Sequence, residues 1–214
     1  MFNVIPVINC LDEVCVKDKV RRIEEFFGKE SWAHLDVADG CFTFHKTWND
    51  PSVWPRIGGR LSLEVHLMTE HPHGPALSWI WAGAKRIIVH LETLHKTTAK
   101  AIVEMAKVRN ADVMLAISPE TPVERLQSYF KLFSQFQILA VNPGLAGQAF
   151  LPVVLGKIKF LRRQFPGATI EVDGGINPET AKLVRVAGAD TVVSATYIFG
   201  NSNPKRAYEA LHNV

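Results

Sequence analysis

The chain has 214 residues, of which 47% are hydrophobic and 21% are charged. This length suits one domain or two small ones, and the apolar content excludes a largely disordered protein. The net charge of +3 is small and the basic residues are scattered, which argues against a nucleic-acid-binding protein. No apolar run reaches the roughly 18 residues of a membrane span, and residues 1–10 do not resemble a signal peptide.

The cysteines indicate the compartment. The chain has three of them, which cannot form a closed set of disulfides. Cys10 and Cys15 also lack the nearby second pair that a zinc site would need. We therefore expect reduced cysteines and a cytoplasmic protein.

Short runs rich in β-branched residues predict eight β-strands. In chain order they cover residues 3–8, 32–37, 61–67, 86–91, 112–117, 137–141, 169–172 and 191–194. Helical patterns follow almost every strand, at residues 16–27, 75–82, 97–108, 122–133, 152–165, 178–187 and 204–211. Only the segment after the second strand, residues 50–57, is weakly helical.

A strand followed by a helix, repeated eight times, predicts a parallel sheet. Eight such units without a linker fit a single (β/α)₈ TIM barrel domain over residues 1–214. The alternative is an open, doubly wound sheet with a Gly-x-Gly-x-x-Gly turn after its first strand. Residues 9–12 read Asn-Cys-Leu-Asp, so the barrel is favoured.

Polar residues stand at the carboxyl ends of three predicted strands, where TIM barrels place their chemistry. His34 and Asp36 share one face of the second strand, Glu64 and His66 share one face of the third, and Asp173 ends the seventh. His34, Asp36, His66 and Asp173 would form a mixed nitrogen and oxygen site that suits zinc, iron, manganese or cobalt. Each residue alone would be read as structural, so the prediction depends on all four.

Four other residues are weaker candidates for the same site. His90 and Glu92 end the fourth strand, where they could line a pocket. His45 and Trp48 lie in the loop after the second strand and could cover it.

A phosphate site is predicted after the seventh and eighth strands, where such barrels commonly bind phosphate. Gly174 and Gly175 would let backbone N–H groups approach a ligand, near the positive end of a helix that begins at about residue 178. A tight turn alone would also explain these glycines. Ala195 and Thr196 precede another turn, and the glycines of residues 142–148 indicate a mobile loop that could act as a lid.

Five blocks of the sequence together resemble the ribulose-phosphate 3-epimerase family. They are HLDVADG at 34–40, EVHLM at 64–68, VNPGLAGQAF at 141–150, VDGGIN at 172–177, and the stretch from GAD to IFG at 188–200. The resemblance covers nearly the whole chain. It implies a ribulose-phosphate-binding (β/α)₈ barrel, an isomerase of the pentose phosphate pathway, one divalent metal ion and a small sugar-phosphate substrate. It also implies a homo-oligomer, because similar barrels form dimers or hexamers.

The resemblance assigns roles residue by residue. The metal ligands it implies are His34, Asp36, His66 and Asp173, with Asp36 and Asp173 as the acid and base. The phosphate would be held by backbone around Gly174, Gly175, Ala195 and Thr196. The lid that closes over the substrate would be Gly144, Leu145, Ala146 and Gly147.

This chemistry is coherent. Epimerisation beside a ketone removes a proton from one face of carbon 3 and returns one on the other face. Two carboxylates on opposite sides of a barrel could do this, each positioned transfer contributing about 10²–10⁴-fold. A metal ion would stabilise the enediolate as a Lewis acid, and one Asp must start protonated.

The chain departs from the family pattern at positions that would face the substrate. Changed positions are Val7 for Ser, Ala38 and Leu139 for Met, Phe44-His45 for Pro-Asn, Leu145-Ala146 for Phe with Gly or Ser, and Ala195 for Gly. Three hypotheses therefore stay open. They are interconversion of D-ribulose 5-phosphate and D-xylulose 5-phosphate, epimerisation of another ketose phosphate such as allulose 6-phosphate, and sugar-phosphate binding without catalysis. A related barrel decarboxylase is disfavoured, because its Asp-x-Lys-x-x-Asp pattern is His34-x-Asp36-x-x-Asp39 here.

Overall fold

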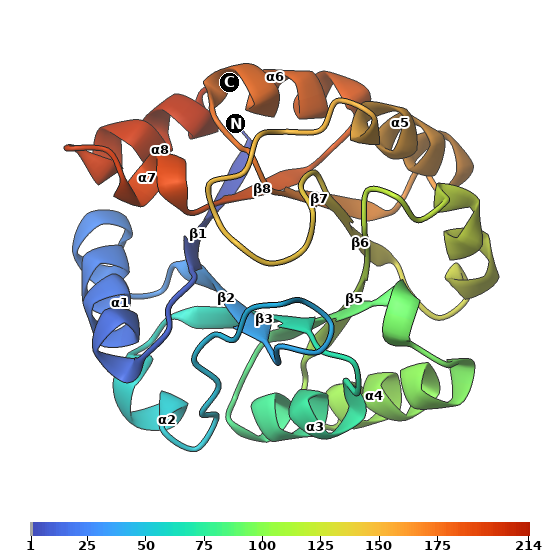
Figure 1. The fold of residues 1–214 in the computed structure, drawn as a ribbon, viewed down its shortest axis with the longest axis horizontal. Helices are drawn as coiled ribbons and strands as arrows, with labels where there is room; N and C mark the ends of the chain where they lie inside the picture. Colours follow the sequence, from blue (N-terminus) through green and yellow to red (C-terminus); the bar gives the residue numbers. More distant parts are fainter. Residues whose placement is uncertain (1) are drawn as a thin grey trace. The chain divides into compact units, whose positions relative to one another are not determined.

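The computed structural model describes residues 2–214, and within that range eight parallel strands join in the order β1 to β8 into a closed barrel (Figure 1). The strands are β1 (Asn3–Ile8), β2 (Trp32–Ala38), β3 (Ser62–Met68), β4 (Arg86–His90), β5 (Asp112–Ile117), β6 (Gln135–Leu139), β7 (Thr169–Asp173) and β8 (Thr191–Ser194). The predicted (β/α)₈ fold is confirmed. No helix in residues 2–214 has the length and apolarity needed to cross a membrane.

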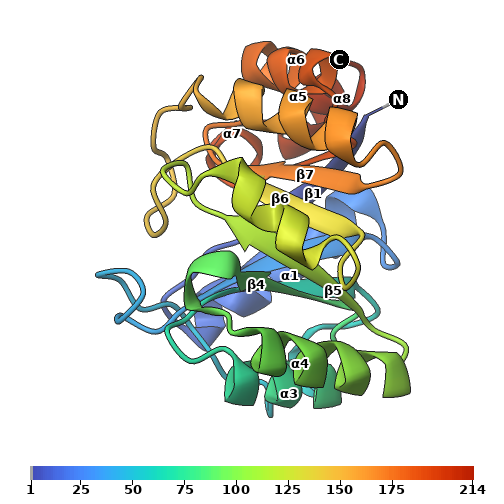
Figure 2. The same ribbon diagram turned by 90° about the vertical axis from the view of Figure 1, so that its right-hand side faces the viewer.

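The described residues divide into two compact units, one made of residues 6–113 and the other of residues 2–5 with 114–214. In the unit of residues 6–113, strands β2, β3 and β4 pair in parallel. Its helices are α1 (Glu13–Phe27), α2 (Trp54–Ile57), α3 (His73–Trp81), the 3₁₀ turn η1 (Leu91–Thr93) and α4 (Lys96–Val108). Helices α3 and α4 lie side by side (Figure 2).

The sequence of helix α1 explains where the helix begins, which face it buries and where it ends. Its N-cap is Asp12, whose carboxylate accepts a hydrogen bond from the backbone N–H of Cys15 at 2.8 Å. It buries Val16, Val20 and Ile23, which follow one another at steps of four and three residues. It ends before Gly28, which has a φ of +100° that few other residues tolerate.

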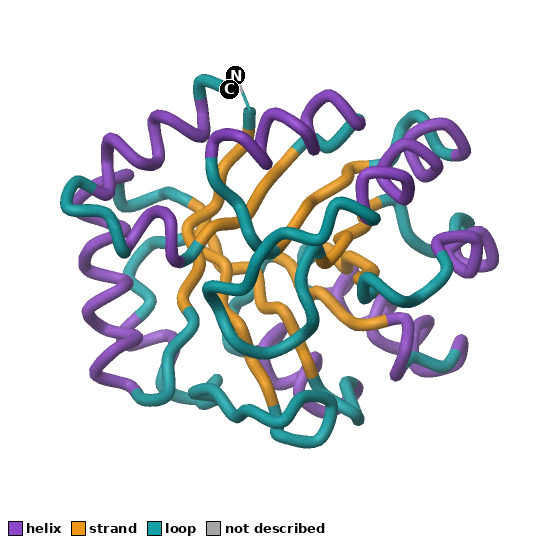
Figure 3. The backbone as a smooth tube through the Cα atoms, turned by 45° about the horizontal axis from the view of Figure 1, so that its top comes forward, coloured by secondary structure: helices purple, strands orange, loops and turns teal. Residues whose placement is uncertain are grey.

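In the other unit, β6, β7 and β8 pair in parallel. Its helical elements are η2 (Val123–Tyr129), α5 (Val154–Gln164), α6 (Pro178–Ala187), α7 (Thr196–Phe199) and α8 (Pro204–His212). Figure 3 shows the two chain ends side by side, and the N–H of Phe2 donates to the carbonyl of His212 at 3.0 Å.

Arg162 of α5 ties together the loops that lead into β7 and β8. Its guanidinium donates to the carbonyls of Pro166 and Ala168, both at 2.7 Å, and to that of Gly188 at 2.8 Å. It also pairs with the carboxylate of Asp190 at 2.6 Å. These contacts lie at the amino ends of the two strands.

Several predicted elements need correction. Helices α1 and α3 begin at Glu13 and His73, three and two residues earlier than predicted, and α5 begins at Val154, two residues later than predicted. The pattern at residues 122–133 predicts an α-helix, but the structure has the 3₁₀ helix η2. Its buried residues Val123, Leu126 and Tyr129 recur every three positions, which fits three residues per turn better than 3.6. The sixth strand begins and ends two residues earlier than predicted, at Gln135–Leu139.

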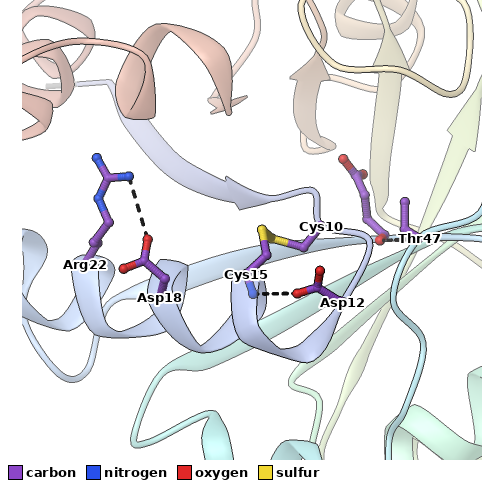
Figure 4. Close-up of a disulfide and its surroundings, with 7 residues drawn as sticks. Cys10, Asp12, Cys15, Asp18, Arg22 and Thr47 are labelled. Carbon is purple, nitrogen blue, oxygen red and sulfur yellow. Dashed lines mark hydrogen bonds and ion pairs between the residues drawn. A yellow bond between two sulfur atoms is a disulfide. The ribbon is translucent and has the colours of Figure 1, made fainter.

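The prediction of reduced cysteines is wrong for one pair. Cys10 and Cys15 form a disulfide (Figure 4), with their Cα atoms 5.7 Å apart. Cys41 is free. The first turn of α1, capped by Asp12, brings Cys15 back beside Cys10. Three cysteines cannot all be paired in disulfides, but two of them can still form one. The cysteines therefore give no support to the predicted cytoplasmic setting.

Candidate active site

Two neighbouring strands position the cluster in the unit of residues 6–113. Alternation along β2 puts His34 and Asp36 on one face, and β3 does the same for Glu64 and His66. The register pairs His34 with Glu64 and Asp36 with His66, so the four side chains meet. His34, Glu64 and His66 are fully buried and Asp36 is 7% exposed.

Three of these side chains converge on one point. The Oδ1 atom of Asp36 lies 3.3 Å from Nε2 of His34 and 3.2 Å from Nδ1 of His66. One ligand atom from each of the three lies within 4.8 Å of the others. Two imidazole nitrogens and a carboxylate oxygen at this spacing suit a divalent transition metal ion.

The ring nitrogen of His34 that points away from Asp36, Nδ1, is held by a buried carboxylate. This atom lies 2.7 Å from Oε1 of Glu64, and Oε2 of Glu64 accepts a hydrogen bond from Arg86 at 2.6 Å. The Arg86 guanidinium also lies over the ring of Trp32, 4.7 Å from its centroid. Such a carboxylate fixes the imidazole tautomer and leaves Nε2 for a metal.

The outer nitrogen of His66 has a different partner. Its Nε2 lies 2.9 Å from Nε2 of His90, and Nδ1 of His90 lies 3.1 Å from Oε2 of Glu92. The weaker candidates His90 and Glu92 thus belong to the cluster. Trp48 instead packs edge-on against Trp79, at 6.0 Å between ring centroids.

Burial and hydrogen bonding compete in setting the charges. Burial opposes the charge on Asp36, yet the hydrogen bonds from His34 and His66 hold the pKa of its carboxyl well below the usual range. Burial likewise opposes charge on His34, but its bonds to Asp36 and Glu64 raise its pKa well above the usual value. Glu64 has a lowered pKa for the same kind of reason, because His34 and Arg86 outweigh its burial. The buried imidazoles and carboxylates of this cluster therefore stabilise one another's charges.

In the other unit, the structure brings the predicted phosphate and lid segments together. Asp173 ends β7 half-buried, and Gly174 and Gly175 follow with φ values of +108° and +65°. A Cβ on Gly175 would lie 2.5 Å from the backbone nitrogen of Phe150, so glycine is needed for this close approach. A Cβ on Gly147 would lie 3.6 Å from the hydroxyl of Thr196.

The predicted lid, residues 144–147, is held in a turn by the side chain that follows it. The side-chain amide of Gln148 donates to the carbonyls of Asn142 and Leu145, at 2.7 and 2.9 Å. Leu145 is 58% exposed. Gly144 and Gly147 have positive φ angles, which favour glycine at both turns.

Helix α6 offers less to a phosphate than its position suggests. Asn177 caps it, and its Oδ1 accepts from the N–H groups of Glu179 and Thr180 at 2.9 and 3.0 Å. Pro178 has no N–H, and the N–H of Ala181 donates to the carbonyl of Asn177. The first N–H donors of α6 are used by its own cap, so only the helix dipole would favour a phosphate at the predicted site.

Sequence reasoning missed two features of these sites. Asn9, directly after β1, donates from Nδ2 to Oδ2 of Asp36 at 2.8 Å. Gln137 and Glu171, paired in register on β6 and β7, are fully buried and joined by a 3.1 Å hydrogen bond. Gln137 and Glu171 could have been found in the sequence, because they are polar residues inside apolar strand runs. Asn9 lies in a loop, where no sequence pattern points to it.

Comparisons with known proteins identify the family of the chain. Residues 3–199 match the model of the ribulose-phosphate 3 epimerase family. The chain belongs to this family. It is 36% identical to the ribulose-phosphate 3-epimerase of Chlamydia muridarum over 202 residues, covering 91% of this chain and 86% of the relative. It is 33% identical to that of Bacillus subtilis over 216 residues, covering 97% and 96%.

Among solved structures, a 3-hexulose-6-phosphate synthase is similar with a TM-score of 0.70, covering 99% of this chain and 98% of the other. At 17% sequence identity, this likeness concerns the fold alone. Membership of the ribulose-phosphate 3-epimerase family confirms the predicted resemblance and the prediction of an isomerase.

Proposed function

We propose that the protein is a metal-dependent 3-epimerase that interconverts D-ribulose 5-phosphate and D-xylulose 5-phosphate. The observation that carries the proposal is the convergence of His34, Asp36 and His66, buried and oriented by Glu64 and His90, in a chain of this family. A buried carboxylate among imidazoles is costly unless it serves a cation or a reaction.

The proposed ligand set is completed by Asp173. It stands at the carboxyl end of β7, and strands that run parallel in a closed barrel share one catalytic end. The donor set fits zinc, iron, manganese or cobalt, since it combines imidazole nitrogens with carboxylate oxygens. A divalent cation bound there would stabilise the negative charge of the enediolate.

Asp36 and Asp173 would move the protons. One carboxylate takes the proton from carbon 3, and the other, protonated beforehand, delivers one to the opposite face. The carboxylate of Asp36 is well placed, because Oδ1 faces the two imidazoles while Oδ2 faces away from them toward Asn9. Which aspartate starts protonated depends on the direction of the reaction.

Residues of the other unit would hold the phosphate and close the site. Backbone around Gly174, Gly175, Ala195 and Thr196 is proposed to bind the phosphate. The segment of Gly144, Leu145, Ala146 and Gly147 is proposed as the lid, and its exposed Leu145 would gain contacts on closing.

One observation favours a second substrate. Val7 pairs with His34 in the register of β1 and β2 and is 3% exposed, so no hydroxyl stands at this buried position beside the cluster. Ala38 at the end of β2 is buried too, whereas Phe44 is fully exposed and lines no enclosed pocket. Ala38 is smaller than the methionine usual in the family and Val7 lacks the usual hydroxyl, and together they favour a larger ketose phosphate, such as allulose 6-phosphate, as the alternative.

The test is an assay of the purified protein, stripped of metal and reloaded separately with Zn²⁺, Fe²⁺, Mn²⁺ or Co²⁺. We expect interconversion of the two pentulose phosphates and exchange of the carbon 3 proton with deuterium from D₂O. A panel of ketose phosphates, compared by kcat/KM, decides between the substrates. Phosphate-ester binding with no exchange on any ketose phosphate would contradict catalysis and indicate a sugar-phosphate-binding protein.

Two variants test the proposed acid and base. Asp36→Asn and Asp173→Asn should each abolish deuterium exchange in a folded protein. Asp18→Asn, an exposed change on α1, is the matched control and should retain the parent's rate. Analytical ultracentrifugation of the same samples tests the proposed homo-oligomer.

A further inference from the structure

Asn9 makes a contact with the site that none of the predicted roles uses. It directly follows β1, in which Val7 and Ile8 pair with His34 and Leu35 of β2, so Asn9 comes next to Asp36. Its side-chain amide donates to Oδ2 of Asp36 at 2.8 Å, and Asn9 itself is half-buried. An amide nitrogen has no charge and can only donate, so the bond orients this oxygen.

The two oxygens of Asp36 are therefore not equivalent. Oδ1 faces His34 and His66, while Oδ2 is held by Asn9. The last torsion of an aspartate is soft, so a carboxylate without such a bond can turn and exchange its oxygens. With Asn9 in place, Oδ1 stays on the metal side, and Oδ2 keeps a second lone pair free to take a proton.

The segment that carries Asn9 is itself fixed at several points. Cys10 is bonded to Cys15 at the start of α1, and Asp12 caps the same turn (Figure 4). The carbonyl of Cys10 accepts from the N–H of Trp48 at 2.8 Å. From the other side, the hydroxyl of Thr47 donates to the backbone carbonyl of Asp36 at 2.7 Å.

We propose that Asn9 is a positioning residue that assigns the two oxygens of Asp36 to separate tasks, and that the disulfide between Cys10 and Cys15 keeps Asn9 in place. This inference rests on the proposed function, because it concerns the carboxylate that would transfer the proton. Its consequence is that Asn9 affects the rate of proton transfer more than substrate affinity.

The test compares the parent with Asn9→Leu, which has similar volume but no donor, and Asn9→Gln, which restores an amide. In the metal-loaded enzyme with D-ribulose 5-phosphate, Asn9→Leu should lower kcat about 10–100-fold, as the loss of an outer-shell partner typically does. The KM of Asn9→Leu should stay within about threefold of the parent's. Asn9→Gln should recover at least a third of the fall in log kcat that Asn9→Leu causes. Asn203→Leu, which removes a 3.0 Å hydrogen bond to Arg206 on α8, is the matched control and should leave kcat unchanged.

A spectroscopic measurement is independent of turnover. In the Co²⁺-loaded protein, a freed Oδ2 can also turn toward the metal, so the visible absorption of Asn9→Leu should differ from that of the parent and Asn9→Gln should restore it. If Asn9→Leu does not fold, Asn9→Ser, whose hydroxyl is too short to reach Oδ2, replaces it. An unchanged spectrum with kcat within threefold of the parent overturns the proposal, as does an equal loss in Asn203→Leu.

The disulfide is tested by a double-mutant cycle. Replacing Cys10 and Cys15 together by serine should lower kcat in the parent but cause no further loss in the Asn9→Leu background. Equal losses in both backgrounds would refute the role of the disulfide, and Cys41→Ser controls for the loss of a thiol. A parent without epimerase activity would refute the proposed function, whereas an active parent with an unaffected Asn9→Leu variant refutes only this inference.

Discussion

Glu64→Gln tests the buried carboxylate behind His34. Glu64 accepts from Nδ1 of His34 at 2.7 Å and from Arg86 at 2.6 Å, and its side chain is fully buried. Glutamine keeps the shape but presents one neutral oxygen and one NH₂ group, so Arg86 loses its charged partner and Nδ1 of His34 loses its acceptor. Breaking a buried ion pair in this way costs about 3–5 kcal/mol in the free energy of unfolding.

The same substitution should change the tautomer of His34. The NH₂ group of glutamine can donate to Nδ1, which moves the imidazole proton to Nε2, the nitrogen that faces Asp36. A protonated Nε2 has no lone pair for a metal ion. We therefore expect the affinity for Zn²⁺ to fall about 10–100-fold.

Urea unfolding followed by tryptophan fluorescence measures the stability, and competition with a chelating dye measures the affinity for Zn²⁺. Glu25→Gln is the control, because it removes the same charge from an exposed ion pair with Arg21 and should change neither quantity appreciably. If Glu64→Gln unfolds at the urea concentration of the parent and binds Zn²⁺ equally well, Glu64 does not orient His34 and the reasoning fails.

Three further substitutions test other parts of the structure. Partial burial opposes the charge on Asp39, but its carboxylate accepts three backbone hydrogen bonds, which lower its pKa below 3.8. Asp39→Asn should therefore lower the free energy of unfolding by about 1 kcal/mol at neutral pH. Because the folded-state pKa is the lower one, this difference should shrink as the pH falls below about 4, and urea titrations that show no such trend would contradict it. Gly175→Ala should lower the free energy of unfolding, measured by thermal unfolding, by about 2–3 kcal/mol, because φ is positive there and the new Cβ would clash with Phe150. The control Gly156→Ala lies at an open helical position of α5 and should leave the stability unchanged or slightly higher. Lys157, itself buried, donates to the carbonyls of Ser118 and Thr121. Lys157→Met should therefore lower the free energy of unfolding by about 2–3 kcal/mol, and an unchanged unfolding midpoint would refute its role.

The strands were predictable because most of them are short, largely apolar runs, and seven of the eight predicted ranges match to within a residue at each end. The histidines and aspartates at their ends were predictable for a related reason, since polar residues interrupt buried runs only where they have partners. The partners themselves were not. Glu64 could be placed on the same face as His66, but its bond to His34 depends on the register of β2 and β3, which no local pattern determines.

The disulfide and Asn9 show a second limit of sequence reasoning. Counting three cysteines does not reveal that Cys10 lies just before a helix and Cys15 on its first turn, where the Asp12 cap brings them together. Asn9 lies in a loop, and its contact with Asp36 becomes visible only when β1 is laid beside β2. The error at η2 has a simpler origin, because apolar residues at steps of three satisfy both kinds of helix.

The hydrogen bonds of Arg162 stabilise only one end of β7 and β8. One guanidinium secures the amino ends of both strands through four residues, and lysine could not replace its planar fork. The carboxyl ends of the same strands carry Gly174, Ala195 and Thr196, which take no part in that anchorage. Under the proposed function, exchange of residues such as Leu145 or Ala195 would alter the recognition of the sugar while the fold stays secured from the opposite end of the strands.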